Sequence, residues 1–360
     1  MKFSLPSFGN ASLIGLDIGS NSVKAVEIAM KSRDKGFELR SLGQAPLAPE
    51  AIVQGAFLNS SAIVDAIREA IDDGKISNKD VAAAVSGHSV IVKRVNFPRM
   101  TREELEDQIQ WEAEQYIPFD VNEVNLDFQI LDSNEEEGQM DVLLVAAKKD
   151  LIDDYYQVIS EAGLNPVAID VAGFAVQNAY EVNYEQDPEA VTALVNIGAQ
   201  VVNINVLRNG IPAFTRDIMT GGSQYTEEIQ KALSVSYEEA ERIKTGGTPG
   251  DDGQVQDVIP QEVEQAMRSV SDTVIGEISR SLDFFAATSA DARITRVLLS
   301  GGGSQISGLA AGFAERTGIE TDLMNPLAHI LPSKGFGAQY LETMGPLLSV
   351  AIGLATRRAD

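Results

Sequence analysis

The residues best suited to chemistry lie in the stretch 16-LDIGSNSVK-24, between two runs of β-forming residues. An aspartate and a glycine are followed there by three small polar residues. Two interpretations stay open for such a stretch. It is either a tight hairpin with a structural role, or a hairpin whose backbone amides and hydroxyls surround a phosphate.

A second copy of this pattern favours the phosphate interpretation. The stretch 15-GLDIGSNSVKAVEI-28 matches 194-LVNIGAQVVNINVL-207 at an offset of 179 residues, about half of the 360-residue chain. Both copies run through an Asp or Asn, an Ile and a Gly into an alternating strand. Duplication on this scale predicts two similar α/β halves that face one another.

Two further elements carry residues that suit a nucleotide. The run 296-RVLLSGGGSQISGLAAGFAERTG-318 predicts a buried strand, a glycine turn and a helix, so that a ligand could lie against bare backbone. It has neither the P-loop lysine nor the GxGxxG spacing. In 237-YEEAERIKTGG-247, Glu241 and Lys244 are one helical turn apart on the same face.

Composition excludes several other kinds of site. The chain has no cysteine and two histidines far apart in sequence, which excludes thiolate chemistry and argues against serine–histidine catalysis and histidine-rich metal sites. The 12-residue apolar stretch 345–356 is shorter than the ~20 residues that span a bilayer. No signal peptide is evident, and we expect a cytoplasmic protein.

The elements that must position these residues alternate along the chain. Strands are expected near 37–42, 81–85, 89–97, 125–131 and 140–147, and helices over 61–74, from Thr101 onward and over 150–162. Thr101 and Glu104 form the pattern of a capping box. The order is that of an α/β protein.

At this point the chain closely resembles the type IV pilus assembly protein PilM family of the actin-like ATPase superfamily, related to the cell-division protein FtsA. The stretches that carry the resemblance are 16-LDIGSNSVKAVEI-28, 107-DQIQWEAEQYIPFDVNEVNLDFQIL-131 and 347-LLSVAIGLATR-357. The resemblance implies an actin-like fold of two duplicated RNase H-like halves with an inserted FtsA-type subdomain. It implies a first domain over 1–80 and 166–190, an inserted acidic subdomain over 81–165, a second domain over 191–343 with 222–270 as its outer part, and a closing helix over 344–360.

The same resemblance implies a site for ATP or ADP with Mg²⁺ held by Asp17 through water. It assigns the nucleotide to Asp17, Gly19, Ser20, Asn21, Ser22, Lys24, Asn196, Gly198, Ala199, Gln200, Glu241, Lys244, Gly301, Gly302, Gly303 and Ser304. One position departs from the superfamily, which is expected to have aspartate where this chain has Asn196. Because hydrolysis needs a positioned water and charge stabilisation, we expect ATP binding with slow or absent turnover.

For the inserted subdomain, the resemblance implies a groove that holds the N-terminal tail of the membrane protein PilN. Candidate groove residues are Trp111, Tyr116, Ile117, Pro118 and Phe119. Trp111 falls off the apolar stripe of its helix, so it is either covered by a neighbouring subdomain or offered to a partner. The resemblance also implies a position at the inner face of the bacterial inner membrane, reached through partners.

Charge points to further contacts of the same subdomain. Residues 101–160 hold three Lys/Arg and 17 Asp/Glu, a net charge of −14 out of −25 for the whole chain. Such a surface repels nucleic acid and anionic lipid, and it either serves solubility or attracts a basic partner such as a pilus motor ATPase or platform protein.

Alternative functions within the same fold remain. They are a filament-forming actin-like ATPase, a scaffold of a type II secretion system and, less well supported by the motifs, a sugar kinase. Self-association stays open.

Overall fold

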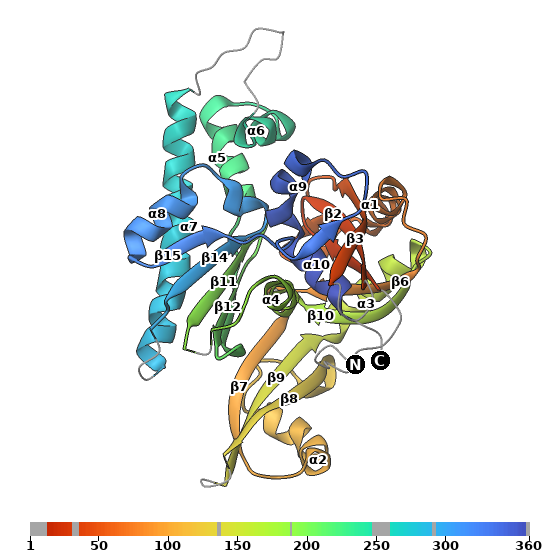
Figure 1. The fold of residues 1–360 in the computed structure, drawn as a ribbon, viewed down its shortest axis with the longest axis vertical. Helices are drawn as coiled ribbons and strands as arrows, with labels where there is room; N and C mark the ends of the chain where they lie inside the picture. The colour runs from red at the N-terminus through yellow and green to blue at the C-terminus, as the bar shows by residue number, and fades with distance from the viewer. Residues whose placement is uncertain are drawn as a thin grey trace.

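The protein consists of two helix-covered mixed sheets that stand side by side, with a smaller sheet extending from them (Figure 1). A computed structural model describes residues 13–30, 36–134, 138–187, 189–246, 260–289 and 293–357. The expected α/β fold with two similar halves is confirmed.

The first sheet has six strands in the order β10-β6-β1-β2-β3-β16, and its centre is the hairpin that carries the first loop. β1 and β2 pair antiparallel, whereas β1 and β6 pair parallel. The strands are β1 (Ile14–Ile18), β2 (Ser22–Met30), β3 (Phe37–Pro46), β6 (Asp80–Val85), β10 (Asn165–Val171) and β16 (Ile330–Pro332). A two-stranded ribbon, β4 (Ile52–Val53) with β5 (Ala56–Phe57), lies between β3 and the first helix in the chain.

Helix α1 (Ser60–Asp73) covers this sheet because its isoleucines recur every four residues. Ile63, Ile67 and Ile71 are all buried. The Asn59 side chain accepts a hydrogen bond from the Ala62 amide and begins the helix, as an N-cap does.

The second sheet repeats the arrangement in the order β13-β12-β11-β14-β15. β11 and β12 form the second hairpin, and β14 pairs parallel with β11 as β6 does with β1. The elements are β11 (Val191–Ile197), β12 (Val202–Arg208), β13 (Ile211–Ile218), α5 (Ser223–Leu233), α6 (Tyr237–Lys244), α7 (Gln261–Thr288), β14 (Arg296–Ser300), the 3₁₀ turn η2 (Gly302–Gln305), α8 (Leu309–Thr317) and β15 (Glu320–Leu323).

The smaller sheet, in the order β7-β9-β8, has a hydrophobic core of its own. Helix α2 buries Leu105, Ile109 and Ala113 in that core. The expected capping box between Thr101 and Glu104 is present. The elements are β7 (Val90–Pro98), α2 (Arg102–Ala113), the 3₁₀ turn η1 (Val121–Glu123), β8 (Val124–Asn134) and β9 (Gln139–Lys148).

This inserted subdomain is shorter than the expected range 81–165. β6 is a central strand of the first sheet, because the run Val81–Val85 is buried and pairs with both β1 and β10. Helix α3 (Lys149–Glu161) buries its apolar stripe in the core under that sheet. The range from β7 to β9, residues 90–148, is therefore the part that stands apart.

The C-terminal helix α10 (Ser349–Thr356) packs so closely on its neighbours that two contacts require glycine. A Cβ on Gly353 would lie 1.6 Å from the carbonyl oxygen of Ala175 in α4 (Ala172–Asn183). A Cβ on Gly15 of β1 would lie 1.8 Å from the carbonyl oxygen of Ala351. α10, preceded by α9 (Ala338–Met344) and η3 (Gly345–Leu348), thus closes on the first half.

Candidate functional site

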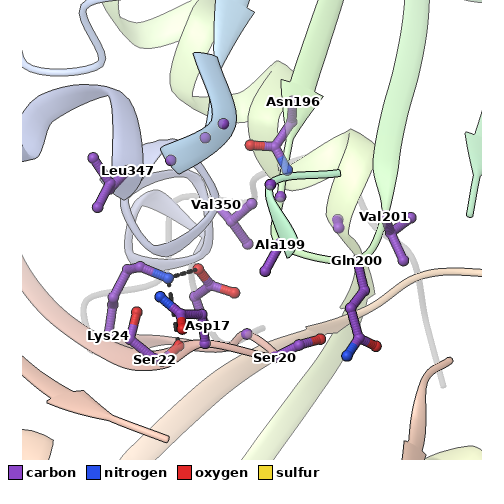
Figure 2. A pocket seen from close by; sticks show the side chains of 18 of the residues that line it. Asp17, Ser20, Ser22, Lys24, Asn196, Ala199, Gln200, Val201, Leu347 and Val350 are labelled. Carbon is purple, nitrogen blue, oxygen red and sulfur yellow. Dashed lines mark hydrogen bonds and ion pairs between the residues drawn. The ribbon is translucent and has the colours of Figure 1, made fainter. Parts of the chain in front are cut away.

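The first hairpin loop makes a tight turn that leaves a charged pair facing a pocket between the two halves. The Gly19 amide donates to the Ser22 carbonyl oxygen at 3.2 Å. Asp17 and Lys24 are register partners across the hairpin, and Lys24 Nζ lies 3.0 Å from Asp17 Oδ2. Both side chains line the pocket (Figure 2).

The second hairpin loop makes the same turn, with the Gly198 amide donating to Val201 at 2.9 Å. Its register partners at the equivalent positions are Asn196 and Asn203, whose amides are hydrogen-bonded at 3.0 Å. The duplication thus gives one charged pair in the first half and one neutral amide pair in the second, and both pairs line the pocket.

The glycine turn after β14 lies against the second hairpin. Gly301 has a φ of +81°, and a Cβ there would lie 2.4 Å from the Ile197 carbonyl oxygen, so the position needs glycine. A Cβ on Gly303 would lie 2.4 Å from Ile197 Cγ2. Gln305 lines the pocket, whereas the buried Ser304 hydroxyl donates to the Gly301 carbonyl oxygen and holds the turn.

Helix α6 places Glu241 and Lys244 at the pocket as a partly buried ion pair, 2.5 Å apart. Lys244 Nζ also donates to Thr226 Oγ1 at 3.0 Å and to the Gly222 carbonyl oxygen at 3.3 Å. Thr226 in turn donates to Glu241 at 2.6 Å. Lys244 is therefore held by the protein itself at the pocket wall.

Hydrogen bonds cross the pocket mouth from one half to the other. Asn21 donates to Glu241 at 3.4 Å and accepts from the Tyr237 hydroxyl at 3.4 Å. Gln200 donates to the Ile52 carbonyl oxygen at 2.9 Å and accepts from the Gln54 amide at 3.0 Å. We call these four bonds the cross-cleft contacts.

Every residue expected to hold a cofactor lines this pocket except Ser304. Tyr155, Leu347 and Val350 also line it, and sequence reasoning missed them because they come from α3, η3 and α10. Burial, helped by the charge of Asp17, holds the pKa of Tyr155 well above its usual range, so its hydroxyl stays protonated.

The donor set fits a nucleotide phosphate with magnesium. Two lysines and the amides of two hairpin loops and a glycine turn surround the pocket, which suits anionic oxygens. Within the described residues, no group of three His, Asp or Glu side chains could hold a metal alone. Mg²⁺ usually combines one or two carboxylates with phosphate oxygens and waters, and Asp17 can supply one carboxylate.

A second concave surface lies where the inserted subdomain meets the first half and the turn between β12 and β13 of the second half. The face of β8 and β9 that carries Gln129 and Leu143 is turned toward β10 and α4, and two adjacent pockets run along it. Phe174 of α4 and Glu181 lie on the opposite wall. Burial raises the pKa of Glu181. β8 is an edge strand of its sheet in the described part of the chain.

The expected groove residues lie elsewhere, on the α2 side of the inserted subdomain. Ile117 is buried in its core, Tyr116 and Phe119 pack against that core, and Pro118 is exposed. Trp111 is 75% exposed, so of the two alternatives, cover by a neighbouring subdomain is excluded for the described residues. In the acidic stretch 101–160, Glu135, Glu136 and Glu137 lie outside the part of the chain that the structure describes.

The comparisons with known proteins agree with the fold. A family model described as type IV pilus assembly protein PilM matches residues 15–359. In solved structures, the PilM–PilN type IV pilus biogenesis complex is similar with a TM-score of 0.84 and 28% identity, over 96% of this chain and 98% of that chain. MreB5 of Spiroplasma citri bound to AMPPNP has a TM-score of 0.51 and 13% identity, over 96% and 95% of the two chains, which shows a shared fold.

The cell division protein FtsA of Bacillus subtilis (strain 168) is 24% identical over 259 residues. The match covers 65% of this chain and 58% of FtsA, less than two thirds of that relative. Within the described ranges, no helix combines the length and apolar character needed to cross a bilayer. On the family match over nearly the whole chain, this protein belongs to the type IV pilus assembly protein PilM family.

Proposed function

We propose that this chain is an ATP-binding scaffold of the type IV pilus assembly complex at the cytoplasmic face of the inner membrane. In this proposal it binds the N-terminal cytoplasmic tail of PilN and supports pilus assembly and twitching motility. The family match over residues 15–359 and the similarity to the PilM–PilN complex support the pilus part of the proposal. The pocket built from both hairpin loops, the glycine turn and α6 supports its nucleotide-binding part.

Nucleotide binding follows from the pocket's donors, with Asp17 as the carboxylate that would hold Mg²⁺ through water. Turnover is expected to be slow or absent, because the second hairpin carries Asn196 where the resemblance leads us to expect aspartate. A neutral amide polarises an attacking water less than a carboxylate does. A hydrolysis rate of about 0.1–1 per second or more would contradict this part.

The concave surface along β8 is the site that we propose for the PilN tail. An edge strand offers free backbone groups to an extended peptide, and apolar pockets beside it select side chains. Leu143 and Phe174 provide such apolar walls, and Glu181 provides a carboxylate suited to a basic residue or an amino terminus.

This assignment is tested by titrating a synthetic PilN tail peptide into the protein in a calorimeter. Phe174→Ala is expected to weaken binding about tenfold or more, as truncation of a central anchor does. Phe284→Ala is the matched control, since Phe284 is exposed on α7 in the second half. Absence of binding to the wild type, or equal effects of the two variants, would remove the PilN assignment from this surface.

The acidic face of α2 is proposed as a separate contact surface for a basic partner, a motor ATPase or a platform protein. Exposed Trp111 lies on one stripe with Glu103, Asp107 and Glu114, at helical spacings of four, four and three. α2 covers the sheet face opposite Leu143, so this surface is distinct from the proposed tail site. Asp107→Lys combined with Glu114→Lys is expected to abolish that contact in a pull-down with purified partner and leave PilN peptide binding unchanged.

A further inference from the structure

A continuous chain of hydrogen bonds leads from the pocket to the start of the inserted subdomain. Ser300 Oγ lies 3.3 Å from Asn196 Oδ1, and Asn196 Nδ2 donates to Asn203 Oδ1 at 3.0 Å. Asn203 Nδ2 donates to Asp217 Oδ1 at 2.8 Å, and the Gly87 amide donates to Asp217 Oδ2 at 2.6 Å. Asp217 is thus the end of the chain and accepts from two directions.

The carboxylate of Asp217 determines the direction of every bond in this chain. Burial raises the pKa of Asp217, and the hydrogen bonds from Asn203 and Gly87 act in the opposite direction by stabilising the ionised form. In that form the carboxylate can only accept, so Asn203 turns its NH₂ group toward Asp217 and its oxygen toward Asn196. Asn196 must then turn its NH₂ group toward Asn203. The Asn196 oxygen consequently faces Ser300 and Gly301, where a Cβ on Gly301 would lie 2.7 Å from it.

The position of this carboxylate relates the two halves of the molecule. In the first half the cross-hairpin pair is Asp17 with Lys24, and the negative charge stands at the pocket. In the second half the pair is neutral, and the charge lies one strand further out, since Asp217 on β13 is the register partner of Asn203 on β12. The charge that Asn196 lacks is therefore present two hydrogen bonds away.

We propose that Asp217 is a positioning residue of the nucleotide pocket, which holds Asn196 with its oxygen as an acceptor on the Ser300 side. An oxygen there suits the hydrogens of metal-bound water, whereas an NH₂ group would suit a bare phosphate. Asp217 therefore favours the magnesium complex of the nucleotide over the metal-free form. This inference rests on the nucleotide binding proposed above.

The test compares ADP affinities with Mg²⁺ and with a chelator by calorimetry. The ratio of the ADP affinity with Mg²⁺ to the ADP affinity with a chelator is expected to fall about three- to tenfold in Asp217→Asn, the range for one net hydrogen bond. The reason is that the side-chain amides of Asn203 and Asn196 can then rotate by 180° and exchange their oxygen and NH₂ positions. Asp283→Asn, which removes an exposed charge on α7, is expected to keep the wild-type ratio. The double variant Asn196→Asp, Asp217→Asn has a carboxylate at position 196, which can only accept hydrogen bonds. This variant is expected to restore the wild-type ratio of the two ADP affinities.

The outcomes separate this inference from the proposed function. If the wild type binds no nucleotide, both are overturned. Suppose instead that the wild type binds ADP more tightly with Mg²⁺ than with a chelator. If Asp217→Asn keeps that preference, or weakens ADP binding equally with Mg²⁺ and with the chelator, the positioning role alone is overturned. Should Asp217→Asn fail to fold, Asn203→Leu interrupts the same chain, and an unchanged ratio in that variant overturns the role of Asp217.

Discussion

Replacing Lys24 by methionine is expected to weaken ADP binding about 10- to 150-fold. Lys24 Nζ is held in the pocket by Asp17 at 3.0 Å and by the Ser22 carbonyl oxygen at 3.5 Å, and its side chain is 11% exposed. A hydrogen bond to a charged group contributes about 1.5–3 kcal/mol, and about 1.4 kcal/mol corresponds to a factor of ten. The upper end is expected, because Lys24→Met also leaves Asp17 without its cation beside the phosphates.

Calorimetry with ADP and with AMP separates the loss of a phosphate contact from the effect of leaving Asp17 without its cation. If Lys24 contacts the outer phosphate, AMP affinity should fall much less than ADP affinity. The double variant Lys24→Met, Asp17→Asn in metal-free buffer removes the unpaired carboxylate, so its remaining loss reports the phosphate contact. Lys231→Met, an exposed lysine paired with Glu228, is the matched control. Equal losses for ADP and AMP would refute the reasoning.

Three further expectations concern stability and pH. Gly353→Ala should lower the unfolding free energy by about 1–3 kcal/mol in urea, since its Cβ would meet Ala175, and an unchanged value would contradict the packing described. Arg357→Ala should cost about 3–5 kcal/mol by leaving buried Asp170 unpaired, while replacing both by apolar residues should recover most of the loss. Burial raises the pKa of Glu181, so the folded chain binds that proton more tightly and stability falls as pH rises through the raised pKa. At pH 7, Glu181→Gln should therefore unfold at a higher temperature than the wild type, whereas at about pH 4 the two should unfold at similar temperatures. A lower unfolding temperature of Glu181→Gln at pH 7 would be inconsistent with a raised pKa.

Local patterns were sufficient to predict both hairpin loops. Each turn depends on a glycine amide bonded to a carbonyl three residues on, so the repeat at an offset of 179 residues indicates both. The resemblance assigns Ser304 to the site, but its hydroxyl donates to the Gly301 carbonyl oxygen. Tyr155, Leu347 and Asp217 could not be predicted, because they reach the site through tertiary packing of distant segments.

The boundaries of the inserted subdomain show the same limit. The run Val81–Val85 predicts a strand correctly, yet nothing in the run says which sheet it joins. Helix α3 likewise has an apolar stripe that could cover either sheet. Trp111 was correctly recognised as lying off the apolar stripe of α2, but whether another element covers it depends on distant packing. Which sheet a strand joins, and which element buries a side chain, depends on the tertiary structure of the whole chain.

The cross-cleft contacts have a kinetic consequence. They join the two halves at the pocket mouth through Asn21 with Glu241 and Tyr237, and through Gln200 with the backbone at Ile52 and Gln54. We expect a nucleotide bound in the pocket to leave faster when these bonds are removed, because they join the two halves at its mouth. Tyr237→Phe removes one of these bonds at a residue outside the expected nucleotide site, so it should shorten the dwell of a bound nucleotide and leave its phosphate contacts in place.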